Sequence, residues 1–194
     1  HSRMLNAGQA CICAKRFIVT EKVADEFVSL FAKSIQSLQQ GDPLKKGIHL
    51  GPLARLDLAE TLASQLEKSL KQGAKLIVGG EHENCNFQPT LIDFVAVDSV
   101  AFQEETFGPL ATVIRAKDEN DAVAIANNHR YGLAAAIWTE DREKAYKIAR
   151  NIEAGNVFVN SLVRSDSRVP FGGVKKSGYG RELGAVGIKE FMNM

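Results

Sequence analysis

The sequence predicts an α/β fold, with a largely parallel sheet and helices on both faces. The chain has 194 residues, of which 45% are hydrophobic and 24% are charged, so it can bury one good core. From residue 74 to residue 160, short apolar stretches alternate with amphipathic stretches of helical period. Alternating strands and helices form parallel sheets, because each helix carries the chain back across a face of the sheet.

Two amphipathic helices are expected before residue 74. In residues 21–41 the apolar side chains recur every three or four positions, which is the helical period. They are Val23, Phe27, Leu30, Phe31, Ile35 and Leu38. Gly41 and Pro43 are expected to end this helix. A second helix is expected over residues 54–73, where leucines stand four residues apart, and it should close at Gly73.

Four short apolar stretches are expected to form buried strands. They cover residues 74–80, 110–117, 133–139 and 156–160. A helix should follow each of the middle two strands, with Asp118 capping the first of these helices and Thr139 the second. Gly155 is expected to stop the second helix. Residues 161–187 are rich in Gly, Ser, Arg and Lys, which indicates a long loop system near a ligand.

The composition limits the classes of partner. A formal net charge of +1, with both signs interspersed, provides no basic face for nucleic acid or an anionic membrane. No apolar run approaches the roughly 18 residues of a membrane helix, and no signal-peptide pattern opens the sequence. Three cysteines suit a reducing compartment rather than a disulfide framework. We therefore expect a cytoplasmic protein whose partner is a small molecule or another subunit.

Neither phosphate motifs nor metal motifs fit this sequence. The glycines of "GYGRELG" are too far apart for G-x-G-x-x-G, and "GGVKKSG" lacks the Gly-Lys-Ser/Thr order of a P-loop. A zinc site at Cys11 and Cys13 would need two more ligands, but the next cysteine is Cys85 and the histidines are scattered. No metal site is expected.

Two interpretations of Cys11 follow from its neighbours. A free cysteine is most often a small buried hydrophobe. However, Gly8, Gln9 and Ala10 form an adaptable turn of small residues directly before the sulfur. Backbone N–H groups of such a turn could converge on an oxygen whose carbon is attached to the sulfur, as in an oxyanion hole. The residues alone leave both interpretations open.

Six segments, in order along the chain, resemble signatures of the aldehyde dehydrogenase superfamily. They are "MLNAGQAC" (4–11), "FQPTL" (87–91), "EETFGPL" (104–110), "YGLAAAIWT" (131–139), "GNVFVN" (155–160) and "PFGGVKKSGYGRELG" (170–184). The resemblance implies an oxidoreductase that uses NAD or NADP. In that family a cysteine thiolate attacks an aldehyde, the thiohemiacetal passes a hydride to nicotinamide, and water hydrolyses the thioester.

The resemblance also implies roles for four residues. Cys11 matches the nucleophile, and its N–H would supply half of the oxyanion hole. Glu105 would bind a cofactor ribose through its hydroxyls, and Phe107 would pack beside the nicotinamide. Phe171 would line the aldehyde tunnel. The alternatives are an exposed carboxylate for Glu105 and ordinary core packing for Phe171.

The segment from Ser165 to Leu183 is most similar to a bacterial branch of the family, the succinate semialdehyde dehydrogenases. Leu5 stands where some members have an arginine that grips the distal carboxylate of the substrate. Arg164, Ser165 and Arg168 are therefore candidates to bind that carboxylate, unless they form only a solvated loop.

The Cys11–Cys13 pair resembles a redox switch of some relatives, in which a disulfide blocks the nucleophile. The alternative is an inert buried thiol at Cys13, because a disulfide between residues so close requires a strained backbone.

By the same resemblance, residues 1–194 form the catalytic domain of a homodimeric or homotetrameric enzyme. The N-terminal cofactor-binding domain, with its Asn and its general-base Glu, is expected to be absent from this chain. Alone, the chain should then be inactive, because hydride transfer needs both domains to align the reactants. The other readings are a stand-alone module that binds aldehydes or partners without turnover, and a CoA-acylating aldehyde dehydrogenase.

Overall fold

The computed structural model describes residues 1–193 and divides the chain into two compact units, His1–Ala122 and the residues from Val123 onwards. Helix α4 (Glu119–Asn127) spans the boundary between them. That residues 1–194 make up one catalytic domain stays a prediction.

The first unit is built on a four-stranded sheet with the order β1-β6-β5-β2. Strands β1 (Arg16–Thr20) and β5 (Thr90–Asp93) both run parallel to the central strand β6 (Leu110–Ala116). Strand β2 (Lys75–Val78) pairs antiparallel with β5 at the edge. The predicted class, a largely parallel α/β sheet, is confirmed.

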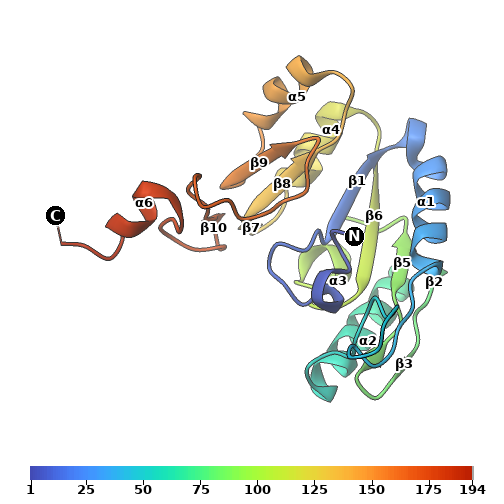
Figure 1. Cartoon of the computed structure of the whole chain (residues 1–194). Coiled ribbons are helices and arrows are strands. Elements are labelled where there is room, and N and C mark those ends of the chain that lie inside the picture. The colour runs from blue at the N-terminus through green and yellow to red at the C-terminus, as the bar shows by residue number, and fades with distance from the viewer. Residues whose placement is uncertain (194) are drawn as a thin grey trace. The chain divides into compact units, whose positions relative to one another are not determined.

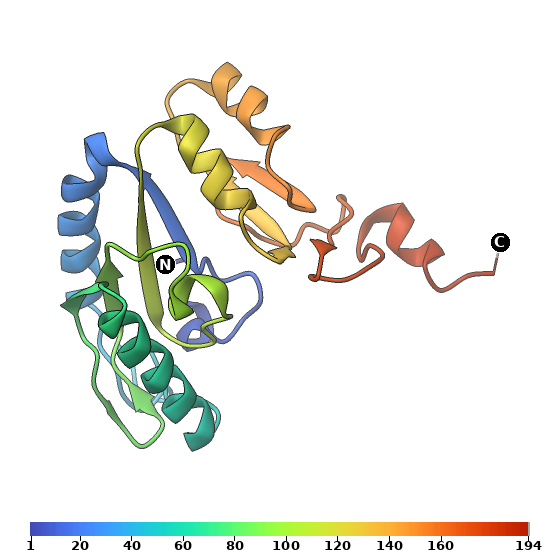
Figure 2. The same cartoon turned by 180° about the vertical axis from the view of Figure 1, so that it is seen from behind.

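Helices cover both faces of this sheet, as Figures 1 and 2 show. Neighbouring residues of a strand point to opposite faces. Accordingly, Phe17 of β1 packs edge to face against Phe31 of α1 (Glu21–Gln36), with ring centroids 4.8 Å apart. The Arg16 guanidinium lies over Phe102 of α3 (Val100–Gln103) on the other face, 5.2 Å from the ring centroid. Helix α3 in turn packs on α2 (Leu56–Lys71).

Three small elements complete the first unit. A short helix, η1, covers Leu5–Gly8 directly before the cysteine pair. A hairpin of β3 (His82–Glu83) and β4 (Asn86–Phe87) connects β2 to β5.

The second unit holds two small sheets. Strands β8 (Ala134–Ile137) and β9 (Asn156–Val159) run parallel, joined by α5 (Arg142–Ala149). Strands β7 (Tyr131–Gly132) and β10 (Val174–Lys175) pair antiparallel. Helix α6 (Gly184–Lys189) follows, so the expected loop system of residues 161–187 also contains a strand and the start of a helix.

Two predicted helix boundaries were wrong. Helix α1 ends at Gln36, before Gly41, and the Gly41 N–H donates instead to the Leu50 carbonyl at 3.0 Å. The cap of α5 is Asp141, whose carboxylate accepts from the Lys144 N–H at 2.9 Å, and not Thr139. Asp118 caps α4 as predicted, since its carboxylate accepts from the Asp121 N–H at 2.9 Å.

Gly155 was predicted to stop a helix, yet α5 already ends at Ala149. A Cβ atom on Gly155 would lie 1.7 Å from the carbonyl oxygen of Gly172. The glycine is therefore required by a close approach of two backbone segments and not by a helix terminus. Strands β1 and β5 were not predicted at all. Among residues 1–193, no helix is long and apolar enough to cross a membrane.

Candidate active site

Cys11 follows a turn of three consecutive residues in the left-handed region. The φ angles of Asn6, Ala7 and Gly8 are +49°, +53° and +77°. Such angles are unfavourable for a residue like alanine and are kept only where the surroundings enforce them. Gln9 does so, because its amide donates to the Asn6 carbonyl at 3.1 Å and accepts from the Ala54 N–H at 2.9 Å.

A second backbone segment lies directly against this turn. A Cβ atom on Gly8 would lie 2.1 Å from the carbonyl oxygen of Gly108, so no side chain fits at this position. In Figures 1 and 2 the N-terminal loop lies beside α3, after which the chain runs through residues 104–109. The Gly8–Gly108 contact therefore brings two of the predicted signatures together.

The Arg3 side chain forms hydrogen bonds to both segments. Its side chain is almost fully buried, and its guanidinium donates to the carbonyls of Gly8 at 2.8 Å, Thr106 at 3.0 Å and Gly108. Burial lowers the pKa of Arg3 to about 10, because the charged form loses its hydration.

Lys15 lies between the same segments and touches three predicted site residues. Its ammonium lies 3.2 Å from the Glu105 carboxylate, donates to the Cys11 carbonyl at 3.3 Å and sits 5.7 Å from the Phe107 ring centroid. Burial lowers the pKa of Lys15, and the charge of Arg3 lowers it further, while Glu105 raises it. Its side chain is only 18% exposed.

The three cysteines are all free and differ in exposure. Cys11 is exposed, Cys85 is half-buried and Cys13 is buried. The Cys13 thiol donates to the Leu5 carbonyl at 3.3 Å, so it points into the turn that precedes Cys11. An exposed thiol on a strained turn is accessible to a substrate, and a buried one is not.

Glu105 and Phe107 present their side chains outward, 42% and 37% exposed, on either side of the fully buried Thr106. The Gln65 amide on α2 holds this segment, since it donates to the Glu104 carboxylate at 2.9 Å and to the Glu105 carbonyl at 3.3 Å. One carboxylate oxygen of Glu105 contacts Lys15.

In the second unit, Phe171 is buried, and its N–H donates to the Glu182 carbonyl at 2.8 Å. The Asn156 side chain on β9 holds the adjacent chain, donating to the Pro170 carbonyl at 3.1 Å and accepting from the Gly172 N–H at 3.3 Å.

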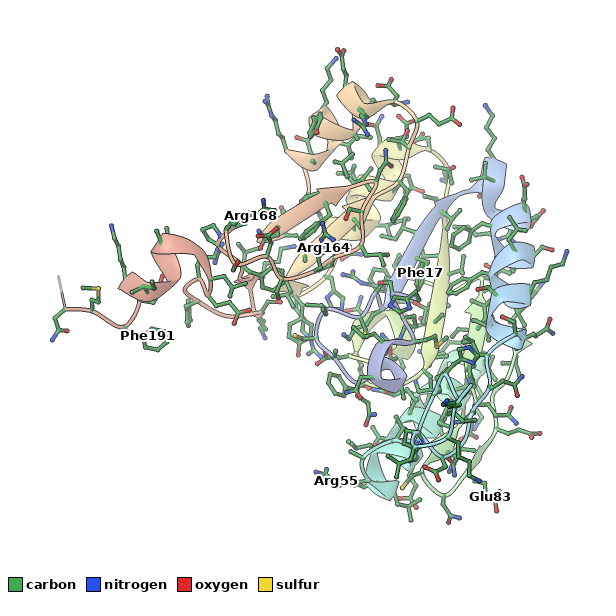
Figure 3. The ribbon with its side chains drawn as sticks, in the orientation of Figure 1. Phe17, Arg55, Glu83, Arg164, Arg168 and Phe191 are labelled. Atoms are coloured by element: carbon green, nitrogen blue, oxygen red, sulfur yellow. The ribbon has the colours of Figure 1, made fainter. Side chains whose placement is uncertain are left out.

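The three candidate carboxylate-binding residues are exposed in the loop after β9, where Figure 3 labels Arg164 and Arg168. They differ in their partners. Arg168 is held by Asp166, whose carboxylate accepts from its Nε at 2.9 Å and from its terminal nitrogen at 2.7 Å. This pairing lowers the pKa of Asp166 well below its usual range. Within residues 1–193, Arg164 forms no ion pair within 4.0 Å, although its charge also lowers the pKa of Asp166 from a greater distance.

The structure thus brings Cys11, Glu105 and Phe107 together within the first unit and places Phe171 and the loop arginines in the second. Sequence reasoning missed Arg3 and Lys15. It named Gln9 as part of the turn before Cys11, but not as the residue that holds this turn. Nothing in the spacing of Arg3 or Lys15 indicated a contact with residues 105–108, about 90 to 105 positions further along the chain.

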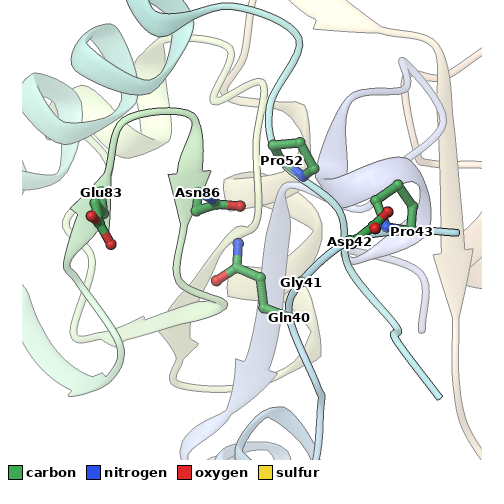
Figure 4. A pocket seen from close by; sticks show the side chains of 7 residues that line it. All are labelled: Gln40, Gly41, Asp42, Pro43, Pro52, Glu83 and Asn86. Atoms are coloured by element: carbon green, nitrogen blue, oxygen red, sulfur yellow. The ribbon is translucent and has the colours of Figure 1, made fainter. Parts of the chain in front are cut away.

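A separate hollow in the first unit contains none of the predicted site residues. Its lining side chains are Gln40, Gly41, Asp42, Pro43, Pro52, Glu83 and Asn86 (Figure 4). Across the described part of the chain, no three His, Cys, Asp or Glu side chains gather as a metal site would require.

Known structures place this α/β fold among aldehyde-oxidising enzymes. The succinic semialdehyde dehydrogenase of Streptococcus pyogenes, solved with NADP+, matches 99% of this chain and 43% of its own, with a TM-score of 0.95 and 37% identity. A glyceraldehyde-3-phosphate dehydrogenase of Methanocaldococcus jannaschii, solved with NADP, matches 97% of this chain and 41% of its own, with a TM-score of 0.92 and 38% identity.

The sequence comparison agrees. The model of the aldehyde dehydrogenase family matches residues 1–194, and the chain therefore belongs to this family. A succinate semialdehyde dehydrogenase [NAD(P)+] of Escherichia coli strain K12 is 45% identical over 195 residues, which cover 99% of this chain and 42% of that protein. The chain thus spans about two fifths of the length of the curated relatives it matches.

Proposed function

We propose that this chain is the thiol-bearing part of an enzyme that oxidises an aldehyde, with succinate semialdehyde as substrate and NAD or NADP as cofactor. The support for the substrate is that relatives of 41–45% identity bear the name of succinate semialdehyde dehydrogenase. The support for the chemistry is the exposed Cys11, whose backbone carbonyl contacts the same Lys15 ammonium that contacts Glu105 and Phe107.

In this proposal Cys11 is the nucleophile. Its thiolate adds to the aldehyde carbon, the C=O π electrons move to the oxygen, and the Cys11 N–H stabilises the resulting oxyanion. Oxidation turns the thiohemiacetal into a thioester, and water then releases the acid and restores the thiol. The strained turn at Asn6–Gly8 fixes the Cys11 backbone, so the N–H donor is oriented before the reaction begins.

Glu105 and Phe107 fit the binding of a nicotinamide cofactor. When bound, the nicotinamide supplies a hydride acceptor. Lys15 contacts one oxygen of the Glu105 carboxylate, which leaves the other to accept hydrogen bonds from ribose hydroxyls. The part-exposed ring of Phe107 offers an apolar face beside it. Phe171 would line the path of the aldehyde, as expected from the resemblance.

We also infer that Cys13 is a buried thiol and not one half of a redox switch. A disulfide with Cys11 would require the Cys13 sulfur to leave its buried site and its hydrogen bond to Leu5. Peptide mapping after mild oxidation would contradict this inference if it recovered a Cys11–Cys13 crosslink.

The proposal predicts selective labelling of Cys11 by brief treatment with substoichiometric iodoacetamide near pH 7. Cys11 should react at least about tenfold faster than Cys13 or Cys85, because it alone is exposed. Peptide mass spectrometry measures the three rates in one sample. Labelling of Cys85 alone would contradict the proposal and would favour a binding module without turnover.

A second prediction concerns the distal carboxylate of the substrate. In the holoenzyme, Arg164→Gln should raise the KM for succinate semialdehyde about tenfold, because a charge-assisted contact is lost. The KM for butanal, which lacks the carboxylate, should not change. The matched variant Arg168→Gln should have a smaller effect, since Asp166 already occupies that guanidinium. Equal KM changes for the two aldehydes would show that Arg164 does not read the carboxylate.

A further inference from the structure

One ammonium group connects the turn of Cys11 to the segment of Glu105. The Lys15 Nζ donates to the carbonyl oxygens of Ala10 and Cys11 at 3.3 Å each, and to that of Cys13 at 3.4 Å. The Glu105 carboxylate lies 3.2 Å away. Four acceptors therefore surround the three N–H donors of one part-buried lysine.

The contact with Ala10 has a chemical consequence at its neighbour. The Ala10 carbonyl and the Cys11 N–H belong to the same peptide group. A hydrogen bond from a cation to the carbonyl oxygen draws electron density away from the nitrogen, and this makes the N–H a stronger donor. The effect is largest where little water competes, and the Lys15 side chain is only 18% exposed.

We propose that Lys15 is a positioning residue of the thiol site, which polarises the Ala10–Cys11 peptide and thereby strengthens the Cys11 N–H as the donor to the developing oxyanion. This inference rests on the proposed function, in which Cys11 is the nucleophile and its N–H binds the oxyanion. Lys15 acts through Cys11 and needs no contact with the substrate.

The same ammonium also couples the thiol turn to the proposed cofactor residues. Its contact with Glu105 fixes one carboxylate oxygen, and the Phe107 ring centroid lies 5.7 Å from it. A displacement of Glu105 therefore changes the acceptors available to Lys15, and with them the polarisation of the Ala10–Cys11 peptide.

A lysine with matching contacts elsewhere in the chain supplies a control. The Lys175 ammonium donates to the carbonyls of Asn127 at 2.8 Å and His129 at 3.1 Å, and it pairs with Glu153 at 2.5 Å. Like Lys15, it is part-buried and bridges carbonyl oxygens to a carboxylate. It contacts none of the proposed site residues.

Two reactions of the same sulfur separate the oxyanion effect from thiol reactivity in general. With p-nitrophenyl acetate, the Cys11 thiolate adds to the ester carbon, an oxyanion forms, and the C–O bond then breaks to leave a thioester and p-nitrophenolate. With iodoacetamide, the thiolate forms an S–C bond while the C–I bond breaks and iodide leaves. Only the first reaction develops charge on an oxygen. Neither reaction requires a cofactor.

For the 194-residue chain, Lys15→Met should lower the acylation rate about tenfold relative to the alkylation rate. This is less than the roughly 100-fold or larger loss that follows removal of a whole oxyanion donor, because the N–H itself remains. Lys175→Met should leave the ratio of the two rates unchanged. Lys15→Arg should recover part of the loss, because its guanidinium keeps the charge and the donors.

Each outcome bears on a different claim. An unchanged ratio in a folded Lys15→Met chain, checked by circular dichroism, would overturn the role of Lys15 while leaving Cys11 as the nucleophile. If Lys15→Met does not fold, Lys15→Gln decides, because it keeps N–H donors but removes the charge, and a native ratio there would also overturn the role of Lys15. Acylation that peptide mapping assigns to a residue other than Cys11 would instead refute the proposed function.

Discussion

Replacing Cys11 with serine is expected to lower the rate of acylation by p-nitrophenyl acetate by at least about 10³-fold. The sulfur reacts as a thiolate, which is a much stronger nucleophile than a neutral hydroxyl. A serine hydroxyl does not ionise near neutral pH, and residues 6–11 contain no histidine that could accept its proton. The measurement is the release of p-nitrophenolate in the first turnover, with the acylated peptide identified by mass spectrometry.

Cys85→Ser is the matched control for this experiment. Cys85 is half-buried in the turn between β3 and β4, outside the thiol site, so its loss should leave the rate unchanged. If Cys11→Ser retained more than about a tenth of the native rate, another group would have to be the nucleophile, and the assignment of Cys11 would be wrong.

Arg3→Met is expected to lower the free energy of unfolding by about 3 kcal/mol. The substitution leaves the carbonyls of Gly8 and Thr106 without their donor, and each unsatisfied buried acceptor costs about 1 to 3 kcal/mol. The Gly108 carbonyl loses the same guanidinium but still accepts from the Leu110 N–H at 2.8 Å. Relief from burying the guanidinium offsets part of this loss. Urea denaturation followed by far-UV circular dichroism measures the difference.

Arg16→Met is the matched control for Arg3→Met, and we expect it to change the free energy of unfolding much less. Arg16 is half-buried, and burial lowers its pKa to about 10. However, one of its terminal nitrogens has no hydrogen-bond partner, so methionine should change the free energy of unfolding by less than about 1 kcal/mol. Equal losses for the two variants would show that the carbonyl contacts of Arg3 do not carry its contribution.

The elements that sequence reasoning predicted well are those whose signal is local. The helical period between Val23 and Ile35 predicted α1, and the apolar run from Leu110 predicted the central strand β6. Asp118 was a correct cap because a capping side chain binds a backbone N–H only three residues away. The end of α1 was missed, since the Gly41 N–H finds its partner at Leu50, across a loop.

The residues of the candidate site that were predicted are likewise those that belong to short local motifs. The chain order of residues identified the family signatures and, through them, Cys11, Glu105 and Phe107. It also placed Gly8 in a turn of small residues before Cys11, and the structure adds that the φ angle of Gly8 is +77°. What these residues do together stays a prediction until the experiments above are made.

The sequence by itself determined the α/β class, the family and the turn that precedes Cys11. Periodicity and short motifs are properties of nearby residues, so they can be read from the chain order alone. Only the tertiary structure placed Arg3 and Lys15 between the two signature segments, since their partners lie about 90 to 105 positions away. It also showed that Arg168 is already paired with Asp166, whereas Arg164 makes no such close pair. Contacts of this kind depend on how the chain packs, and no local pattern encodes them.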